Sequence, residues 1–154
     1  MLTDLSDVPW TLAVESPLGD GRIDNYVIDS SVHVTTGVVV LLLMVATTFY
    51  LVRLALAGKG VDRLARVLLA GAQLALAVQA LLGIKLLDQG QGVVQLYIHY
   101  LGGLLPLGLF IAAGWFSWGS RVRQARVLAA LTTIGLLSAG MAFTIGQEYA
   151  NRGL

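Results

Sequence analysis

The two histidines of this chain, His33 and His99, are the residues best suited to carry chemistry. Each lies a few residues inside the start of a long apolar stretch, and each is followed four residues later by a glycine, Gly37 or Gly103. An imidazole within an apolar membrane helix is costly unless it faces protein, water or a metal. The matched pair therefore predicts one ligand that both side chains share.

Four stretches of the chain are long enough to cross a lipid bilayer, which takes about 20 apolar residues each. The 154 residues are 56% hydrophobic and only 12% charged, far from the composition of a soluble domain. We therefore predict an all-α integral membrane protein, in which a four-helix transmembrane bundle over residues 31–154 follows an extramembrane arm over residues 1–30. The expected spans are residues 31–52, 64–86, 94–118 and 125–145.

Basic residues gather in the first and third loops between these spans, whereas the arm, the second loop and the tail are acidic or nearly neutral. The positive-inside rule then places both basic loops in the cytoplasm and both termini outside, in a bacterial or archaeal plasma membrane. His33 and His99 fall at the same outer leaflet. The basic residues are Arg53, Lys59, Arg63, Arg66, Arg121, Arg123 and Arg126.

The two halves of the chain contain similar short segments. HVTTG at 33–37 matches HYLGG at 99–103, and ARVL occurs at 65–68 and again at 125–128. A duplicated helical hairpin would relate the halves by an axis along the membrane normal and bring His33 and His99 face to face. Apolar helices also share such short matches by chance, so both explanations remain open.

Two neutral imidazoles on opposite sides of a flat macrocycle are the ligands of a low-spin haem. The first and third helices of a four-helix bundle are diagonal, and a diagonal pair leaves room for that macrocycle. Gly37 and Gly103 share a helix face with the histidines and would line the slot. The chain contains no cysteine, so the haem would be held non-covalently. We therefore predict a haem b with His33 and His99 as iron ligands.

Further polar residues near the outer side could support such a site. Lys85 is a candidate partner for the haem carboxylates, although a lysine at a helix end also extends readily to the lipid headgroups. Thr35 and Thr36 could hydrogen-bond the backbone or the second nitrogen of an imidazole. Gln73 and Gln79, inside the second span, are expected to hydrogen-bond between helices.

Proline and small residues predict how the helices pack. Pro106 lies inside the third span, where it must leave one backbone carbonyl without its helical partner. Gly135 and Gly140 form a small-residue stripe in the fourth span, which favours close packing within the chain and leaves a homo-oligomer open. No basic patch suits nucleic acid, and no Asp or Glu inside a span could complete a zinc site or a proton pathway.

The segments VHVTTGVVVLLLMV at 32–45 and IHYLGGLLPLGLFIAAGW at 98–115 resemble the histidine-bearing helices of four-helix membrane haem proteins. They are most similar to one half of haem A synthase and less similar to cytochrome b561. The resemblance implies a bundle whose paired outer histidines bind haem. The chain departs from haem A synthase in the helices that carry its histidines, in having half the spans, and in lacking an obvious acidic residue in an outer loop next to a histidine helix, unless Asp29 serves. Only His33 and His99 therefore carry over.

The sequence thus predicts a membrane b-type cytochrome that passes single electrons between a quinol, or another membrane redox partner, and an acceptor. A different class remains open, namely a non-catalytic accessory or assembly subunit whose helices only pack against partner subunits. A third candidate is half of a transporter completed by dimerisation, which would require a polar cavity at the midplane of the membrane.

Overall fold

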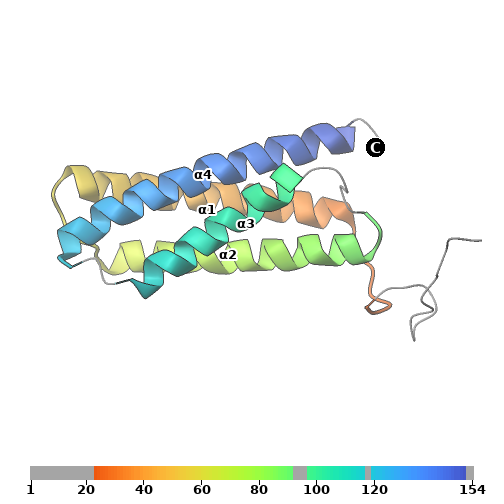
Figure 1. The fold of residues 1–154 in the computed structure, drawn as a ribbon, viewed down its shortest axis with the longest axis horizontal. Coiled ribbons are helices and arrows are strands. Elements are labelled where there is room, and N and C mark those ends of the chain that lie inside the picture. The colour runs from red at the N-terminus through yellow and green to blue at the C-terminus, as the bar shows by residue number, and fades with distance from the viewer. Residues whose placement is uncertain (1–22, 92–96, 117–118, 152–154) are drawn as a thin grey trace, which may run out of the picture.

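The computed structural model describes residues 23–91, 97–116 and 119–151, and in these ranges it consists of four helices without any strand. The helices lie side by side along one long axis (Figure 1). This arrangement confirms the predicted all-α four-helix bundle. The helices are α1 (Ser30–Leu56), α2 (Arg63–Asp88), α3 (Tyr97–Trp115) and α4 (Arg121–Asn151).

Three of the helices are long and apolar enough to cross a membrane: α1, α2 and the Arg121–Glu148 part of α4. The apolar part of α3, Tyr97–Ala113, is shorter than these three helices. The predicted third span, residues 94–118, extends at both ends beyond the residues that the structure describes. Residues 1–22 of the predicted arm also lie outside the described residues. The fourth crossing therefore stays a prediction, while the other three agree with the structure.

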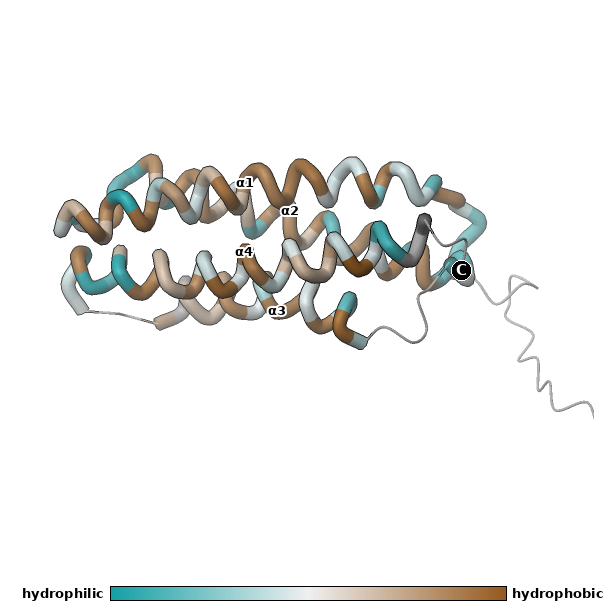
Figure 2. The backbone as a smooth tube through the Cα atoms, turned by 90° about the horizontal axis from the view of Figure 1, so that it is seen from above, coloured by the Kyte–Doolittle hydropathy of each residue, from teal (hydrophilic) through white to brown (hydrophobic). Residues whose placement is uncertain are grey.

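Large apolar side chains cover the outer surface of the bundle. Hydrophobic residues extend along the lengths of the helices (Figure 2), and the side chains of Leu42, Phe49, Leu74 and Leu137 are 65 to 72% exposed. A soluble protein rarely exposes so large a continuous apolar surface. The bundle is therefore built for a lipid environment, as expected of an integral membrane protein.

Local sequence explains where the first two helices begin and end. The carboxylates of Asp29 and Asp62 cap α1 and α2, and each accepts a hydrogen bond from a backbone N–H of the first turn. Gly58 and Gly90 follow the last turns with φ angles of 64° and 76°, which only glycine adopts without strain. The capping aspartates and the two glycines therefore mark the ends of α1 and α2.

Each helix packs against two others, so the bundle has two diagonal pairs. α1 contacts α2 and α4, and α3 contacts the same two helices, whereas α1 and α3 lie across the bundle from each other. The buried cores are a middle cluster around Met44 and Phe110 and a second cluster near the first and third loops. Both alanines of the repeated ARVL segments, Ala65 and Ala125, are fully buried in that second cluster.

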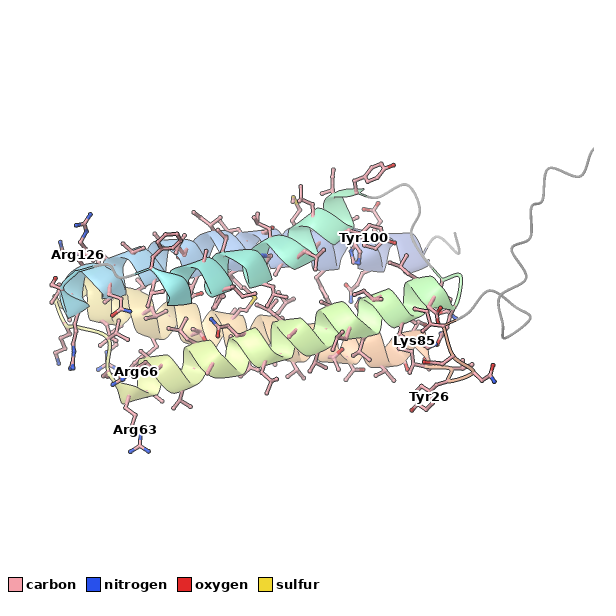
Figure 3. The ribbon with its side chains drawn as sticks, turned by 60° about the horizontal axis from the view of Figure 1, so that its bottom comes forward. Tyr26, Arg63, Arg66, Lys85, Tyr100 and Arg126 are labelled. Atoms are coloured by element: carbon pink, nitrogen blue, oxygen red, sulfur yellow. The ribbon has the colours of Figure 1, made fainter. Side chains whose placement is uncertain are left out.

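The loops between α1 and α2 and between α3 and α4 meet at one end of the bundle. The backbone N–H of Val61 donates to the carbonyl of Arg121, and a Cβ atom on Gly60 would lie 2.6 Å from Cβ of Arg121. Arg63, Arg66 and Arg126 mark this basic end in Figure 3, opposite the end that contains Lys85. The structure thus brings both basic loops to one side, as the charge pattern predicts.

Pro106 is fully buried inside α3 and shapes its contact with α4. Because proline has no N–H, the carbonyl of Gly102 lacks its helical partner, and the hydroxyl of Ser138 donates to it at 3.1 Å. A Cβ atom on Gly102 would lie 3.1 Å from Cβ of Ala142, so glycine allows the helices to approach closely. The freed carbonyl that the sequence predicts is therefore satisfied by the neighbouring helix.

Candidate functional site

A cavity of about 320 Å³ lies among all four helices at the end of the bundle opposite the basic loops. Its volume is at the lower end of the range for small-molecule sites in proteins. Apolar and small side chains make up most of its walls, including Leu76, Leu104 and Phe143. The polar groups that face it are His33, Gln79, His99, Tyr100, Ser30, Gln91 and Gln147.

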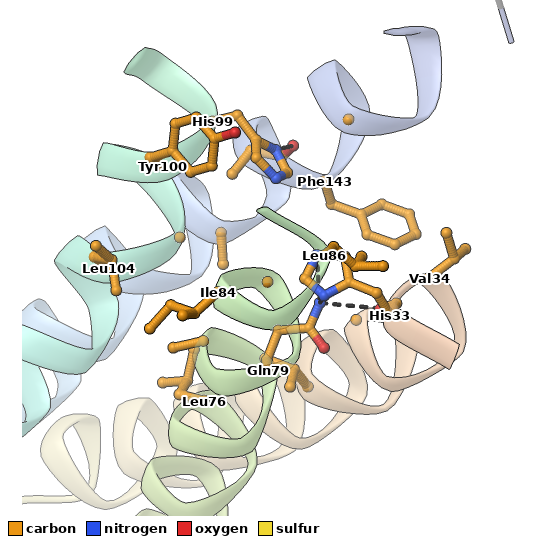
Figure 4. A pocket seen from close by; sticks show the side chains of 18 of the residues that line it. His33, Val34, Leu76, Gln79, Ile84, Leu86, His99, Tyr100, Leu104 and Phe143 are labelled. Atoms are coloured by element: carbon orange, nitrogen blue, oxygen red, sulfur yellow. Dashed lines mark hydrogen bonds between the residues drawn. The ribbon is translucent and has the colours of Figure 1, made fainter. Parts of the chain in front are cut away.

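His33 and His99 reach this cavity from the diagonal helices α1 and α3. The centroids of their imidazole rings are 6.4 Å apart, and the ring planes are inclined by 61°. Figure 4 shows both side chains pointing into the same space, with Gln79 of α2 beside His33. The structure therefore brings together the two residues that the sequence singles out, although they are 66 positions apart.

His99 is held on α4 through its Nδ1 atom, which lies 2.8 Å from the carbonyl oxygen of Ala142. Because a carbonyl can only accept a hydrogen bond, Nδ1 carries the proton and the lone pair of Nε2 stays available. The ring also lies against Gly146, where a Cβ atom would be 2.9 Å from Cε1 of the histidine. His99 is therefore oriented as a metal-binding imidazole usually is.

His33 is held in a different way, through the side chain of Gln79. Nε2 of Gln79 donates to the backbone oxygen of His33 at 3.0 Å and lies 3.2 Å from both ring nitrogens. If the amide nitrogen of Gln79 lay in the plane of the imidazole at equal distances from both ring nitrogens, it would collide with Cε1, the carbon between them. The amide nitrogen therefore lies over the face of the ring. Since the nitrogen lone pairs lie in the ring plane, this contact uses neither of them.

Thr36 supports His33 indirectly. Its hydroxyl lies within hydrogen-bonding distance of the side-chain oxygen of Gln79 and of two carbonyls of its own helix. Of the two contacts that the sequence suggested for Thr36, to the backbone or to the imidazole, the structure shows the one to the backbone. Gln73 donates to the carbonyl of Phe110 on α3 at 3.0 Å. Both glutamines therefore make the contacts between helices that were predicted.

The predicted glycines line the cavity in unequal ways. Gly37 is buried, and a Cβ atom there would lie 3.2 Å from Nε2 of Gln79 and 3.3 Å from the ring of Phe143. Gly103 is exposed, and a Cβ atom there would meet nothing within 4 Å. Gly37 thus permits close packing beside His33, whereas Gly103 leaves open space on the His99 side.

Two further glycines at the site, Gly83 and Gly146, were not predicted from the sequence. Gly83 on α2 faces His33, where a Cβ atom would lie 3.3 Å from Cε1, and Gly146 on α4 faces His99. Gly83 lies near the end of α2, which follows the His33-bearing helix, and Gly146 lies near the end of α4, which follows the His99-bearing helix. When each helical hairpin folds, the glycine comes to the same level along the bundle as the histidine. That position in the hairpin is the sequence signal that could have identified both.

Lys85 lies outside the walls of the cavity. Its ammonium group pairs with Asp24 at 2.7 Å and with Asp88. The hydrogen bond from Lys85 is the main cause that holds the pKa of Asp24 below its usual range. Gln89 also exchanges two hydrogen bonds with the backbone of Ile28. In the structure Lys85 thus fixes the end of the arm to α2, and its role at a cofactor stays a prediction.

The donor atoms at the site suit one kind of metal group better than others. In the described ranges no cluster of three His, Cys, Asp or Glu side chains occurs. Two imidazoles leave a tetrahedral zinc ion short of ligands, but they complete a metal whose remaining ligands come from a flat macrocycle. The chemistry of the donor set therefore favours an axial pair.

The distance between the imidazoles is compatible with such a pair. A metal ion bound by both imidazoles would be joined to each by a metal–nitrogen bond of about 2 Å. When the distance from each nitrogen to the centre of its ring is added to these two bonds, the sum is close to the 6.4 Å between the centroids. Small residues of α2 and α4 also line the cavity. These residues are Ala80, Gly83, Ala139, Ala142 and Gly146.

No protein-family model, no curated protein and no solved structure matches this chain. The resemblance of its histidine segments to membrane haem proteins therefore stays an expectation from the sequence.

Proposed function

We propose that this chain is a membrane b-type cytochrome that holds one haem b between His33 and His99. The observation that carries the proposal is the position of the two imidazoles, 6.4 Å apart on diagonal helices across a shared cavity. The bound proton on Nδ1 of His99 adds support, because it leaves Nε2 free to bind iron.

The residues around the cavity would determine how the cofactor works. A haem supplies one-electron redox chemistry when it is bound, while the protein supplies ligation, burial and orientation. The apolar walls at Leu76, Leu104 and Phe143 exclude water, which tunes the reduction potential. Ser30, Gln91 and Gln147 would offer hydrogen-bond donors to the haem carboxylates.

The proposed partners follow from the surroundings of the site. Apolar helices that extend the length of the bundle suit a quinol dissolved in the bilayer, or another membrane redox subunit, as the source of electrons. With both basic loops in the cytoplasm, the cavity lies in the outer leaflet and electrons leave on that side.

An absorption spectrum of the detergent-purified protein tests the proposal, recorded before and after dithionite and combined with a pyridine haemochrome assay. We expect a Soret band, sharp α and β bands on reduction, and about one haem b per chain, as two imidazole ligands produce. The double variant H33A/H99A should lose the haem, whereas Gln73→Leu, outside the cavity, should keep it.

A wild-type protein that stays colourless after expression with added haem, and after titration with hemin, would contradict the proposal. The accessory subunit would then be the better explanation, because it needs no cofactor. Full haem retention by the double variant would instead show that the haem binds elsewhere.

A further inference from the structure

We propose that the two iron ligands are unequal: His99 stays bound, whereas His33 gives way to a small diatomic ligand of the carbon monoxide class. This inference rests on the proposed haem site and adds a second binding function to it. It follows from the different ways in which the protein holds the two imidazoles.

His99 is fixed by two contacts that act on the ring itself. The hydrogen bond from Nδ1 to the carbonyl of Ala142, at 2.8 Å, sets both the tautomer and the direction of the ring. Gly146 lets the ring lie directly on the backbone of α4, in a space that a methyl group would fill. A histidine that is hydrogen-bonded through its second nitrogen is also a stronger donor to a metal.

The ring of His33 lacks such a fixed partner. No carbonyl or carboxylate among the described residues accepts a hydrogen bond from its nitrogens, which each lie 3.2 Å from the amide nitrogen of Gln79. The space beside Gly83 is also looser than that beside Gly146, at 3.3 Å against 2.9 Å to the facing ring carbon. His33 can therefore rotate away from the iron at a lower cost than His99.

Gln79 makes the vacated position suitable for a small polar ligand. One proton of its side-chain amide donates to the backbone oxygen of His33 at 3.0 Å, and the second is directed over the imidazole ring. When the ring moves aside, that second N–H faces the coordination position it leaves. The ligand would thus meet a neutral donor within an otherwise apolar cavity.

The exchange is balanced without a redox partner. The coordinate bond between His33 and ferrous iron breaks, a bond between the carbon atom of carbon monoxide and the iron forms, and no electron or proton is transferred. Dithionite supplies the ferrous state in the assay. His99 remains on the opposite side throughout.

Carbon monoxide added to dithionite-reduced, haem-loaded wild-type protein tests the inference directly. We expect the Soret band to shift as carbon monoxide replaces one imidazole, with a binding rate limited by the departure of His33. A reduced spectrum that carbon monoxide leaves unchanged at saturation would overturn the inference while leaving the proposed cytochrome intact. Absence of haem from the wild-type protein would overturn both.

Single variants identify which histidine leaves. His33→Ala should keep haem in a five-coordinate, high-spin form that binds carbon monoxide at least tenfold faster than wild type, whereas His99→Ala should lose most of its haem. The reverse order of retention, or equal loss from both variants, would contradict the inference. Far-UV circular dichroism and size-exclusion chromatography check that each variant is folded.

The two facing glycines provide a matched pair that keeps both histidines. Gly146→Ala should weaken haem binding at least tenfold, because its methyl group would displace the ring of His99. Gly83→Ala should weaken haem binding less than Gly146→Ala does and should raise the rate of carbon monoxide binding, because it pushes His33 away. Equal effects of the two substitutions on haem affinity would contradict the assignment.

Discussion

At the scale of single residues, Gln79 connects α2 to α1 through both ends of its amide. Its nitrogen donates to the carbonyl of His33, and its oxygen accepts from the hydroxyl of Thr36. Such hydrogen bonds between membrane helices contribute about 0.6 to 1.7 kcal/mol. Gln79 therefore positions His33 as well as stabilising the hairpin.

Gln79→Leu should lower the free energy of unfolding by about 0.6 to 1.7 kcal/mol, weaken haem binding and speed the binding of carbon monoxide. Gln73→Leu is the matched control, because Gln73 makes a comparable hydrogen bond to Phe110. It should lower stability by a similar amount and leave haem affinity unchanged. Haem titration and unfolding in detergent measure both quantities, and a loss of haem affinity in both variants would mean that Gln79 acts only through stability.

Sequence reasoning located part of the site. His33 and His99 stand out because polar residues are rare in apolar spans. Gly83 does not stand out by residue type, and only its position near the end of the hairpin relates it to His33. Lys85 was predicted to contact a cofactor, and the structure shows Asp24, which is 61 positions away, as a partner for its charge. Competition from a distant carboxylate leaves no local signal in the sequence.

At the scale of the helices, a hydrogen bond from α4 replaces one that proline removes from α3. Pro106 leaves the carbonyl of Gly102 without its helical donor, and Ser138 supplies one. Ser138→Ala should therefore lower the free energy of unfolding by about 0.6 to 1.7 kcal/mol. In a Pro106→Ala background the same change should cost less, because the alanine introduced in α3 would supply the missing backbone N–H.

Unfolding of the wild type, the two single variants and the double variant in mixed micelles gives the coupling between these positions. A loss on Ser138→Ala that is identical in both backgrounds would show that the hydroxyl does not replace the missing donor.

Hydropathy predicted the helices better than it predicted their ends. α4 continues to Asn151, beyond the expected span of residues 125–145, because polar residues can extend a helix outside the hydrocarbon layer. The ends of α1 and α2 depend instead on caps such as Asp62, whose carboxylate accepts from the N–H of Ala65 at 2.8 Å. Which helices lie diagonal, in contrast, is a property of the assembled bundle.

At the scale of the whole molecule, charge predicts the orientation in the membrane. Lys59 lies in the loop between α1 and α2, and Asn25 lies in the described part of the arm, at the opposite end. The chain has no cysteine, so single cysteines introduced at these positions can be labelled selectively. Asn25→Cys should react with a membrane-impermeant maleimide on intact cells, and Lys59→Cys only after permeabilisation, because basic loops stay in the cytoplasm.

The opposite labelling pattern would place both termini in the cytoplasm and the cavity in the inner leaflet. The fold and the proposed ligands would be unaffected, but the electron acceptor would have to be sought on the other side of the membrane.

The diagonal position of α1 and α3 would also link the lifetime of the protein to the proposed haem. These two helices lie across the bundle from each other, so a group bound to both would brace the bundle across its width. Binding to the folded state alone raises the free energy of unfolding with the logarithm of ligand concentration. In a cell short of haem, unbraced copies would open more often and be degraded sooner by membrane proteases, so haem supply would set the amount of this protein.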